Sequence, residues 1–327
     1  MQEFQFGVIG LGGIARQFMA AMQAHDRFIV TAAWDPSEAA RAAAAAQNQG
    51  LSITENAERI FADPAISAIY IASPPQSHCG YILAAVEAGK AIYCEKPLGV
   101  DLAESREVAQ RVLDSGLPNI VNFNHGRALS SCFVEDRIQN GKVGRIGGID
   151  AFIHLSRWPR EFQAAAAWLA RREQGGFTRE MLSHWIYLTR RLLGRSKITY
   201  KNVCYPPDGV TAETRLTAEL DFAGVPLFIK AACGGAGPVG TEYTIWGEKQ
   251  SFRLHSGGRL STASNGTWRE EFTDLADIGQ EDRKRTLDGV AACLAGEAMT
   301  MPSVADALAV QEIIEEILRS APRGPNV

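Results

Sequence analysis

The chain has 327 residues, of which 46% are hydrophobic and 21% are charged, and its formal net charge is −4 at pH 7. This composition is typical of a globular protein, and the length predicts two domains. No basic cluster points to a nucleic-acid or membrane partner, and the N-terminus, MQEFQFGVIGLGG, lacks the basic region and long apolar run of a signal peptide or membrane helix.

Apolar runs alternate with helical segments through about residue 122. Strands are expected at 4–9, 28–34, 65–72, 91–94 and 119–123, and helices at 15–24, 37–46, 78–88 and 101–115. The strands are continuous apolar runs, as a parallel sheet covered on both faces requires. The alternation predicts βαβ units, and therefore an α/β Rossmann domain with a doubly wound parallel sheet over residues 1–121.

The pattern changes after residue 122. Helices are expected at 129–140 and 177–193, a long strand at 146–156, and further strands at 199–205, 213–222, 226–233, 241–247, 251–255 and 267–272. The stretch ETRLTAELDF alternates polar and apolar residues, which is typical of an antiparallel sheet with one covered face. With closing helices at 283–294 and 304–320, residues 122–327 are predicted to form an α+β domain with a large, mostly antiparallel sheet.

The six cysteines are scattered, with no Cys-x-x-Cys pair and no histidine at zinc-ligand spacing. We therefore expect reduced thiols in a cytoplasmic protein and no metal site.

A glycine-rich turn, Gly10-Leu11-Gly12-Gly13-Ile14-Ala15, joins the first expected strand to the first expected helix. In a dinucleotide site the first glycine makes the tight turn, the second lets the backbone approach the pyrophosphate, and the small third residue lets the helix pack on the strand. We expect Gly10, Gly12, Gly13, Ile14 and Ala15 to bind the cofactor. An ordinary strand–helix turn is the alternative.

Asp35 ends the second expected strand, twenty residues after Ala15. A carboxylate there accepts hydrogen bonds from an adenosine ribose and repels a 2′-phosphate, so NAD is favoured over NADP. Arg41 is near enough in sequence to blur this preference. The alternative is an Asp-Pro turn at a helix N-terminus.

The stretch AIYCEKPLG ends an apolar strand on Glu95, Lys96 and Pro97. Strands commonly end in polar turns. Here, however, the turn falls at the carboxyl end of a parallel strand, where the nicotinamide is expected. A lysine at this place can donate to a substrate hydroxyl or carbonyl oxygen and stabilise developing negative charge. Pro97 is expected to fix the turn, with a cis peptide bond as one option, and Glu95 to hold the loop.

Glu180 and His184 are four residues apart on an expected helix, and therefore share one of its faces. A histidine beside a carboxylate is a candidate general base. The alternative is a surface Glu–His pair, and this segment by itself favours that alternative.

Together these motifs resemble the Gfo/Idh/MocA family, the glucose–fructose oxidoreductases and inositol dehydrogenases, over nearly the whole chain. The resemblance is carried by GLGGIA at 10–15, SPPQSH at 73–78, EKPLG at 95–99, NFNHGR at 122–127, Trp168 followed by glycines at 175–176, and His184 with RLLG at 191–194. It implies a Rossmann domain, a second domain with a large sheet, a nicotinamide cofactor, and oxidation or reduction at a sugar or polyol carbon.

In the family the EKP lysine and the helix histidine do the chemistry, and these are Lys96 and His184 here. The resemblance implies that His184 accepts the hydroxyl proton while Lys96 polarises the oxygen. The family often has Asp where this chain has Glu180. Glu180 is expected to orient His184, to bind a second substrate hydroxyl, or to pair with Arg179 or Arg171.

The remaining expected site residues also follow from the resemblance. Besides the glycine turn and Asp35, the expected cofactor contacts are Ser73, Pro74, His78, Glu95 and Lys96. The expected substrate contacts are Lys96, Asn124, Arg127, Trp168 and His184, with His78, Trp158 and Tyr187 as secondary candidates. A structural role is the alternative for each of them except Lys96 and His184. The other histidines, at 25, 125, 154 and 255, are interpreted as structural.

Two other functions stay open from the sequence. One is a glycosidase that keeps NAD bound and cycles hydride internally, and the other is a sugar- or nucleotide-sensing regulator without chemistry. The resemblance also implies a homodimer or homotetramer through the C-terminal sheet, between which the sequence does not choose.

Overall fold

The computed structural model describes residues 2–319 except 49, 165 and 298–299. Contacts divide the chain into two units, one made of residues 1–127 and 280–309 and the other of residues 128–279 and 310–327. The segment 280–309 therefore belongs to the first unit, although the expected boundary at 121/122 places it in the second domain.

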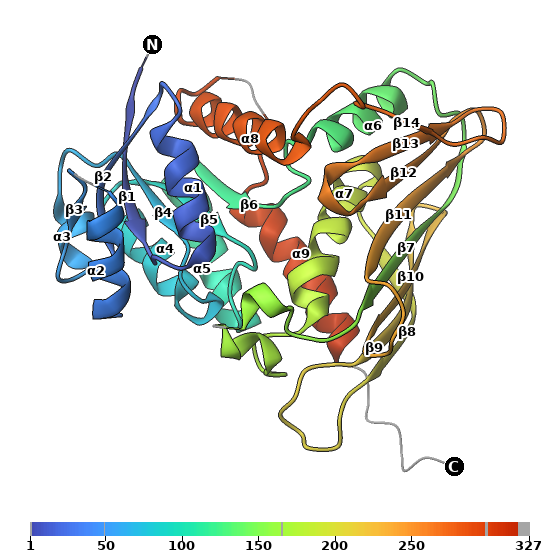
Figure 1. The fold of residues 1–327 in the computed structure, drawn as a ribbon, viewed down its shortest axis with the longest axis horizontal. Coiled ribbons are helices and arrows are strands. Elements are labelled where there is room, and N and C mark those ends of the chain that lie inside the picture. Colours follow the sequence, from blue (N-terminus) through green and yellow to red (C-terminus); the bar gives the residue numbers. More distant parts are fainter. Residues whose placement is uncertain (1, 49, 165, 298–299, 320–327) are drawn as a thin grey trace. The chain divides into compact units, whose positions relative to one another are not determined.

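The first unit is built on a six-stranded parallel sheet (Figure 1). Its strand order is β3-β2-β1-β4-β5-β6, with the bounds β1 Phe4–Ile9, β2 Phe28–Trp34, β3 Ser52–Ile53, β4 Ala68–Ile71, β5 Ala91–Glu95 and β6 Asn119–Asn122. All neighbouring strands pair in parallel. The predicted doubly wound Rossmann sheet is confirmed.

Helices of this unit begin and end where the local sequence favours it. Asp101 accepts hydrogen bonds from two amides at the start of α5, and Gly116, with φ of 64°, ends that helix in the left-handed region. The helices are α1 Gly13–Gln23, α2 Glu38–Gln47, α3 Glu58–Ala62, α4 His78–Glu87, α5 Leu102–Ser115 and α8 Ile278–Leu294, with a 3₁₀ turn, η1, at Pro75–Ser77. α8 adds Leu287 and Val290 to a core that also contains Tyr70 and Tyr93.

The second unit is built on an eight-stranded sheet with the order β14-β13-β12-β11-β7-β10-β9-β8. The strands are β7 Ile146–Leu155, β8 Lys197–Cys204, β9 Arg215–Phe222, β10 Val225–Cys233, β11 Gly240–Gly247, β12 Ser251–His255, β13 Leu260–Ala263 and β14 Arg269–Glu270. β7 and β10 pair in parallel, and the other neighbours are antiparallel. The predicted mostly antiparallel sheet is confirmed.

Helices cover one face of this sheet (Figure 1). They are α6 Leu129–Gln139, α7 Ser183–Leu193 and the part of α9 (Val304–Leu318) that belongs to this unit. Trp185 of α7 stacks on Tyr243 of β11 with ring centroids 4.7 Å apart, and Phe133 of α6 packs edge-on against Phe252 of β12. Three short 3₁₀ turns are η2 Glu161–Gln163, η3 Ala167–Ala170 and η5 Ser256–Gly258.

The structure departs from the expected elements in a few places. β3, α3 and β13 were not expected, and the strand expected at 267–272 is reduced to the two residues of β14. The helix expected at 177–193 begins with one π-helical turn, η4, at Thr178–Leu182. Ser320, the expected last residue of the closing helix, lies outside the described residues.

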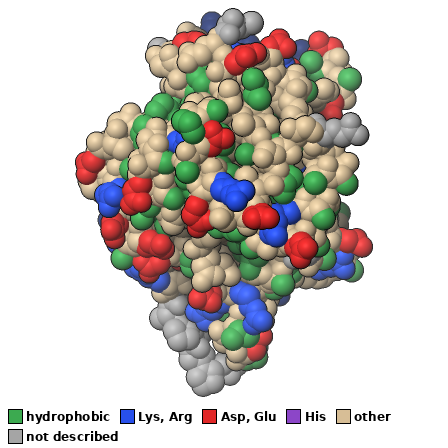
Figure 2. All heavy atoms as spheres, turned by 90° about the vertical axis from the view of Figure 1, so that its left-hand side faces the viewer, with side chains coloured by type: hydrophobic (Ala, Val, Ile, Leu, Met, Phe, Trp, Pro, Cys, Tyr) green, Lys and Arg blue, Asp and Glu red, His purple; other side chains and the backbone are tan. Residues whose placement is uncertain are grey.

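The surface carries charges of both signs. Figure 2 shows the face formed by the left-hand side of Figure 1, where acidic and basic side chains are interspersed and neither covers a large continuous area. Of the helices in the described part of the chain, none has the length and apolar character needed to cross a membrane.

Candidate functional site

The carboxyl ends of the parallel strands gather the predicted residues of the first unit. Gly10 follows β1, Asp35 follows β2, Ser73 lies just beyond β4 and Glu95 ends β5. Asn122, which the sequence analysis did not predict, ends β6. Because these strands are parallel, all five residues lie at the same edge of the sheet. β1 lies between β2 and β4, so the strand order reverses beside the glycine turn, the usual place for a ligand in an open α/β sheet.

The glycine turn has the backbone and the free space that a pyrophosphate requires. Gly10 has φ of 95°, and a Cβ there would lie 2.7 Å from the carbonyl carbon and oxygen of Ala72. A Cβ on Gly12 or Gly13 would have no neighbour within 4 Å in the part of the chain that the structure describes. Among the described residues, no side chain caps the N-terminus of α1. The residues therefore fit a dinucleotide whose phosphates lie over the start of this helix.

Asp35 ties the second strand to the glycine turn. Its Oδ2 accepts the Leu11 N–H at 2.8 Å and its Oδ1 accepts the Ser37 N–H at 2.8 Å. The Arg41 guanidinium donates to the Asp35 backbone carbonyl at 2.7 Å rather than to the carboxylate. A carboxylate has about four acceptor positions, so the local turn and a ribose contact are compatible.

Glu95 is held from both neighbouring strands. Its Oε1 accepts hydrogen bonds from the Tyr70 hydroxyl and the Asn122 side-chain amide, each at 2.7 Å. The Tyr70 ring stacks on Tyr93 with centroids 4.9 Å apart. Burial, followed by the charge of Glu95, raises the pKa of Tyr70, so its hydroxyl stays protonated as a donor. This arrangement fixes the end of β5 immediately before Lys96.

The loop after Lys96 has a cis peptide bond and packs closely against two helices. The Lys96–Pro97 peptide bond is cis, one of the two options that the sequence left open. A Cβ on Gly99 would lie 2.7 Å from Cys79 Sγ and 2.8 Å from Ser105 Oγ, so a larger residue there would displace these side chains of α4 and α5. Lys96 itself is half-buried.

His78 joins this loop to the segment after β4. The side chain is fully buried, with Nδ1 2.7 Å from the Pro97 carbonyl oxygen and Nε2 2.8 Å from the Ser73 carbonyl oxygen. A neutral imidazole can donate only one of these bonds. Burial lowers the pKa of His78 and the two carbonyls raise it, with a net lowering to which the charge of Lys96 contributes. The ring connects the two loops from inside.

In the second unit, Glu180 is held by the segment after β7. Gln163 Nε2 donates to its Oε1 at 3.1 Å, and the Arg160 guanidinium lies 3.8 Å from the same oxygen. Arg160 in turn lies over the rings of Trp158 and Phe162. Of the expected ion-pair partners, Arg179 binds Glu315 through Nε and Nη2, at 2.6 and 2.9 Å. Glu180 forms an ion pair with Arg160, which the sequence did not indicate.

His184 is 9% exposed and lies in the first turn of α7, directly after the π turn that carries Glu180. Single π turns within helices are frequent at functional sites. Tyr187, one turn further, is buried, and Trp158 and Trp168 are half-buried. The Trp158 indole N–H donates to the Leu169 carbonyl oxygen at 2.8 Å, which is a structural contact.

The two substrate candidates from NFNHGR belong to the first unit. Asn124 is exposed and Arg127 is half-buried. A Cβ on Gly289 of α8 would lie 3.1 Å from Arg127 Cγ, so the arginine stem lies along that helix.

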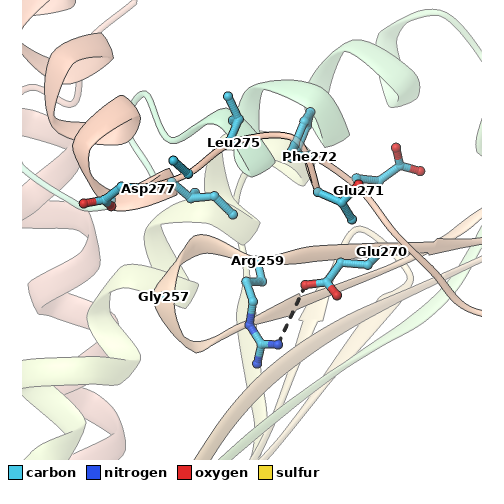
Figure 3. A pocket seen from close by; sticks show the side chains of 11 residues that line it. Gly257, Arg259, Glu270, Glu271, Phe272, Leu275 and Asp277 are labelled. Carbon is cyan, nitrogen blue, oxygen red and sulfur yellow. Dashed lines mark ion pairs between the residues drawn. The ribbon is translucent and has the colours of Figure 1, made fainter.

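A cavity of about 420 Å³ lies at the β13–β14 edge of the second sheet (Figure 3). Arg259 and Glu270 form an ion pair of 3.7 Å on its wall. The remaining lining residues are Gly257, Glu271, Phe272, Thr273 and 275–279. No predicted site residue contributes to this cavity, and we assign it no function.

The sequence analysis missed four residues that hold the predicted ones. Tyr70, Asn122, Arg160 and Glu213 contact Glu95, Glu180 or the start of the helix of His184. Of these four residues, only Asn122 lies in a motif on which the family resemblance rests, because it begins the NFNHGR segment. In the described part of the chain, no group of three or more His, Cys, Asp or Glu residues is arranged to hold a metal ion.

Comparison with known proteins covers almost the whole chain. Residues 4–123 match the model of an oxidoreductase family with an NAD-binding Rossmann fold, Gfo/Idh/MocA, and residues 135–327 match the model of the C-terminal alpha/beta domain of that family.

Two individual curated relatives have less than one third of their aligned residues in common with this chain. Levoglucosan dehydrogenase of Pseudarthrobacter phenanthrenivorans is 29% identical over 204 residues, which cover 59% of this chain and 52% of that protein. Inositol 2-dehydrogenase of Rhizobium meliloti is 26% identical over 262 residues, which cover 80% of this chain and 76% of that protein. The chain spans about half the length of several curated relatives that it matches.

Among solved structures, an oxidoreductase from Agrobacterium radiobacter in complex with NAD+, L-tartaric acid and magnesium shares the fold. Its TM-score is 0.85 at 19% identity, over 99% of this chain and 98% of that chain.

The environment of His78 predicts a pH-dependent stability. The unfolded chain binds a proton on this histidine below pH ~6.5, whereas the folded chain, with its lowered pKa, does so only at lower pH. The free energy of unfolding should therefore decrease as the pH is lowered, by up to about 1.4 kcal/mol per pH unit for one proton. Denaturant unfolding measured from pH 8 to pH 5 should show that the free energy of unfolding decreases less for His78→Gln than for the wild type as the pH is lowered. The five other histidines are common to both proteins. A difference in unfolding free energy that does not change with pH would contradict the prediction, because it would mean that the pKa of His78 is the same in the folded and the unfolded chain.

Proposed function

The chain belongs to the Gfo/Idh/MocA family of oxidoreductases, and on this premise we propose that it transfers hydride between a nicotinamide cofactor and a hydroxyl or carbonyl carbon of a sugar, polyol or related small molecule. The observation that carries the proposal is the shared strand edge at which the glycine turn, Asp35 and the Glu95-Lys96 corner lie together.

The cofactor is NAD, held by residues of the first unit. Gly10, Gly12, Gly13, Ile14 and Ala15 offer the turn and the helix start to its phosphates, and Asp35 offers a carboxylate to its adenosine ribose. Ser73, Pro74 and the Glu95-Lys96 corner contribute further contacts, while His78 supports both segments from behind. When bound, the cofactor accepts a hydride from the carbinol carbon or returns one to the carbonyl carbon.

Lys96 acts on the oxygen of the reacting carbon. Its ammonium group donates a hydrogen bond to that oxygen and favours the negative charge that develops there. His184 takes up the hydroxyl proton in the oxidative direction and returns it in the reductive direction. Glu180 contributes to a substrate hydroxyl contact from the turn before His184. Asn124, Arg127 and Trp168 are the further proposed substrate contacts.

The substrate class follows from the relatives. Proteins named levoglucosan dehydrogenase and inositol 2-dehydrogenase oxidise a sugar derivative and a polyol, by their names. We therefore propose an alcohol carbon of such a molecule as the reacting group.

Substituting Lys96 tests the proposed chemistry. Lys96→Ala should lower kcat by about 10²–10³-fold, the usual cost of removing a hydrogen-bond donor from an oxygen on which negative charge develops. The NADH dissociation constant should stay within a fewfold, because the glycine turn and Asp35 are intact. Steady-state kinetics and NADH fluorescence titration measure the two effects, with the exposed Lys142→Ala as control. Full turnover by Lys96→Ala on its substrate would rule out this role.

Substituting Asp35 tests the cofactor preference. Asp35→Ser removes the charge that repels a 2′-phosphate, so the ratio of NADPH to NADH affinity should rise by about tenfold or more. The comparison uses fluorescence titration of both nucleotides, with the exposed Asp26→Ser as matched control. An unchanged ratio of the two affinities in a folded Asp35→Ser protein would show that Asp35 does not determine the preference between NADH and NADPH.

We propose that the face of the second sheet opposite α6 and α7 binds a second copy of this chain. Phe228 and Asp150 are directly paired across β10 and β7, and Phe152 lies two residues from Asp150, so all three share this face. Phe152, Phe228 and Trp246 are 44%, 46% and 42% exposed. Large apolar side chains exposed together on a sheet favour association.

The double variant Phe152→Lys/Phe228→Lys should therefore shift the protein to the monomer. Size-exclusion chromatography with light scattering measures the mass, and Leu113→Lys, a change at an exposed leucine of α5 in the first unit, is the control. A monomeric wild type, or an unchanged oligomer in the folded double variant, would contradict this interface.

A further inference from the structure

Glu213 is a buried carboxyl group that the proposed reaction does not use. The residue lies just before β9, and only 2% of its surface is exposed. Its Oε1 accepts the backbone N–H of Thr178 at 2.7 Å. Its Oε2 is also buried and has no hydrogen-bond partner among the described residues. Burying a carboxyl group is costly, so a compensating role is expected.

Thr178 is the first residue of the helical segment that carries Glu180 and His184. The first N–H groups of a helix have no partner within it and need an external acceptor. Phe177, in the capping position of this segment, makes no side-chain capping bond. The acceptor for the Thr178 N–H is instead Glu213 Oε1, which lies 35 residues further along the chain, just before β9. A carboxylate there also complements the partial positive charge of the helix start.

The two glycines before Thr178 make room for this contact. Gly176 has φ of 100°, and a Cβ there would lie 2.3 Å from Glu213 Oε2. A Cβ on Gly175 would lie 2.3 Å from the Leu169 carbonyl oxygen, to which Gly176 N–H donates at 2.9 Å. The Gly-Gly corner is thus shaped around the Glu213 carboxyl group and the backbone of η3.

Arg179 anchors the next position. Its guanidinium binds Glu315 of α9 through two nitrogens and donates to the Gly175 carbonyl oxygen at 2.7 Å. The backbone at 178 and the side chain at 179 are therefore both held in place from outside the helix. Glu180 follows directly, and His184 lies about one turn later.

We propose that Glu213 is a positioning residue, which holds the Thr178 N–H and thereby fixes the start of the helix that presents Glu180 and His184. This role rests on the proposed function, since its effect on turnover requires that His184 take part in the reaction. The alternative is that Glu213 contributes only to overall stability.

The electrostatic balance is consistent with a role in geometry. Burial raises the pKa of Glu213, while its bonds to Thr178 and the nearby Arg179 charge lower it, with a net rise. A buried carboxyl group contributes little net stability when an uncharged group of similar shape could replace it. What the Glu213 carboxyl group adds is a hydrogen bond directed at one backbone amide, that of Thr178, at the start of the helix.

Three variants test the proposal in the full-length protein. Glu213→Ala removes the acceptor, Glu213→Gln keeps an acceptor oxygen without the charge, and Glu213→Asp keeps the charge but withdraws it by one methylene. Glu219→Ala, a change on β9 at a partly exposed side chain, is the control. The readouts are hydrogen–deuterium exchange of the peptide containing 178–184, kcat, KM and the pH profile of kcat/KM.

Glu213→Ala should speed exchange of that peptide by about tenfold or more, as expected for the loss of a charged hydrogen bond. It should lower kcat by about 10- to 100-fold, with a shifted pH profile, since small misplacements of catalytic groups are costly. NADH affinity should not change. Glu213→Gln should restore most of the protection and turnover, and Glu213→Asp, which also serves if Glu213→Ala does not fold, should resemble Glu213→Ala.

Unchanged exchange of the 178–184 peptide in folded Glu213→Ala or Glu213→Asp would overturn the proposal, whatever happens to turnover. Faster exchange with unchanged kcat would also overturn it, because the helix start would then not matter for His184. An inactive wild type would instead refute the proposed function, and the exchange comparison would still show whether Glu213 holds the helix.

Discussion

Parallel pairing of β1, β2, β4, β5 and β6 is the constraint on which the first half of the site depends. It brings five chain segments, separated by up to more than a hundred residues, to one edge of one sheet. Each segment then needs only a short local signal: a glycine turn after β1, an aspartate after β2 and a Glu-Lys-Pro corner after β5. The chemistry can be read from short motifs because the sheet supplies their arrangement.

Carboxylates bound to N–H or O–H donors fix this arrangement in detail. Asp35 holds the glycine turn through the Leu11 amide, and Glu95 is held by Tyr70 and Asn122 from the strands beside it. In the second unit Glu213 holds the Thr178 amide at the start of the helix of His184. In each case a directed bond connects a proposed functional segment to a strand or its end. Such bonds limit the freedom of the segment, which is the main requirement for a preorganised site.

The sequence predicted the features that depend on local chemistry or on periodicity. These include both sheets, the glycine turn and the polar corner after β5. It did not predict the contacts made by residues far apart in the chain, such as Glu213 with Thr178 or Arg160 with Glu180, because spacing along a chain carries no information on such pairs. The return of α8 to the first unit was missed for the same reason, since its apolar residues would suit either core.

The central claim is net hydride transfer to a nicotinamide cofactor, and a labelled-substrate assay tests it most directly. The purified protein would be incubated with NAD and a panel of sugars and polyols deuterated at their carbinol carbons. We predict that one substrate class yields NADH that carries deuterium, measured by absorbance and mass spectrometry. Cleavage of a glycoside without net NADH would contradict the claim and indicate an enzyme that keeps its cofactor. Binding of NADH without turnover of any compound would contradict it in favour of a sensing protein.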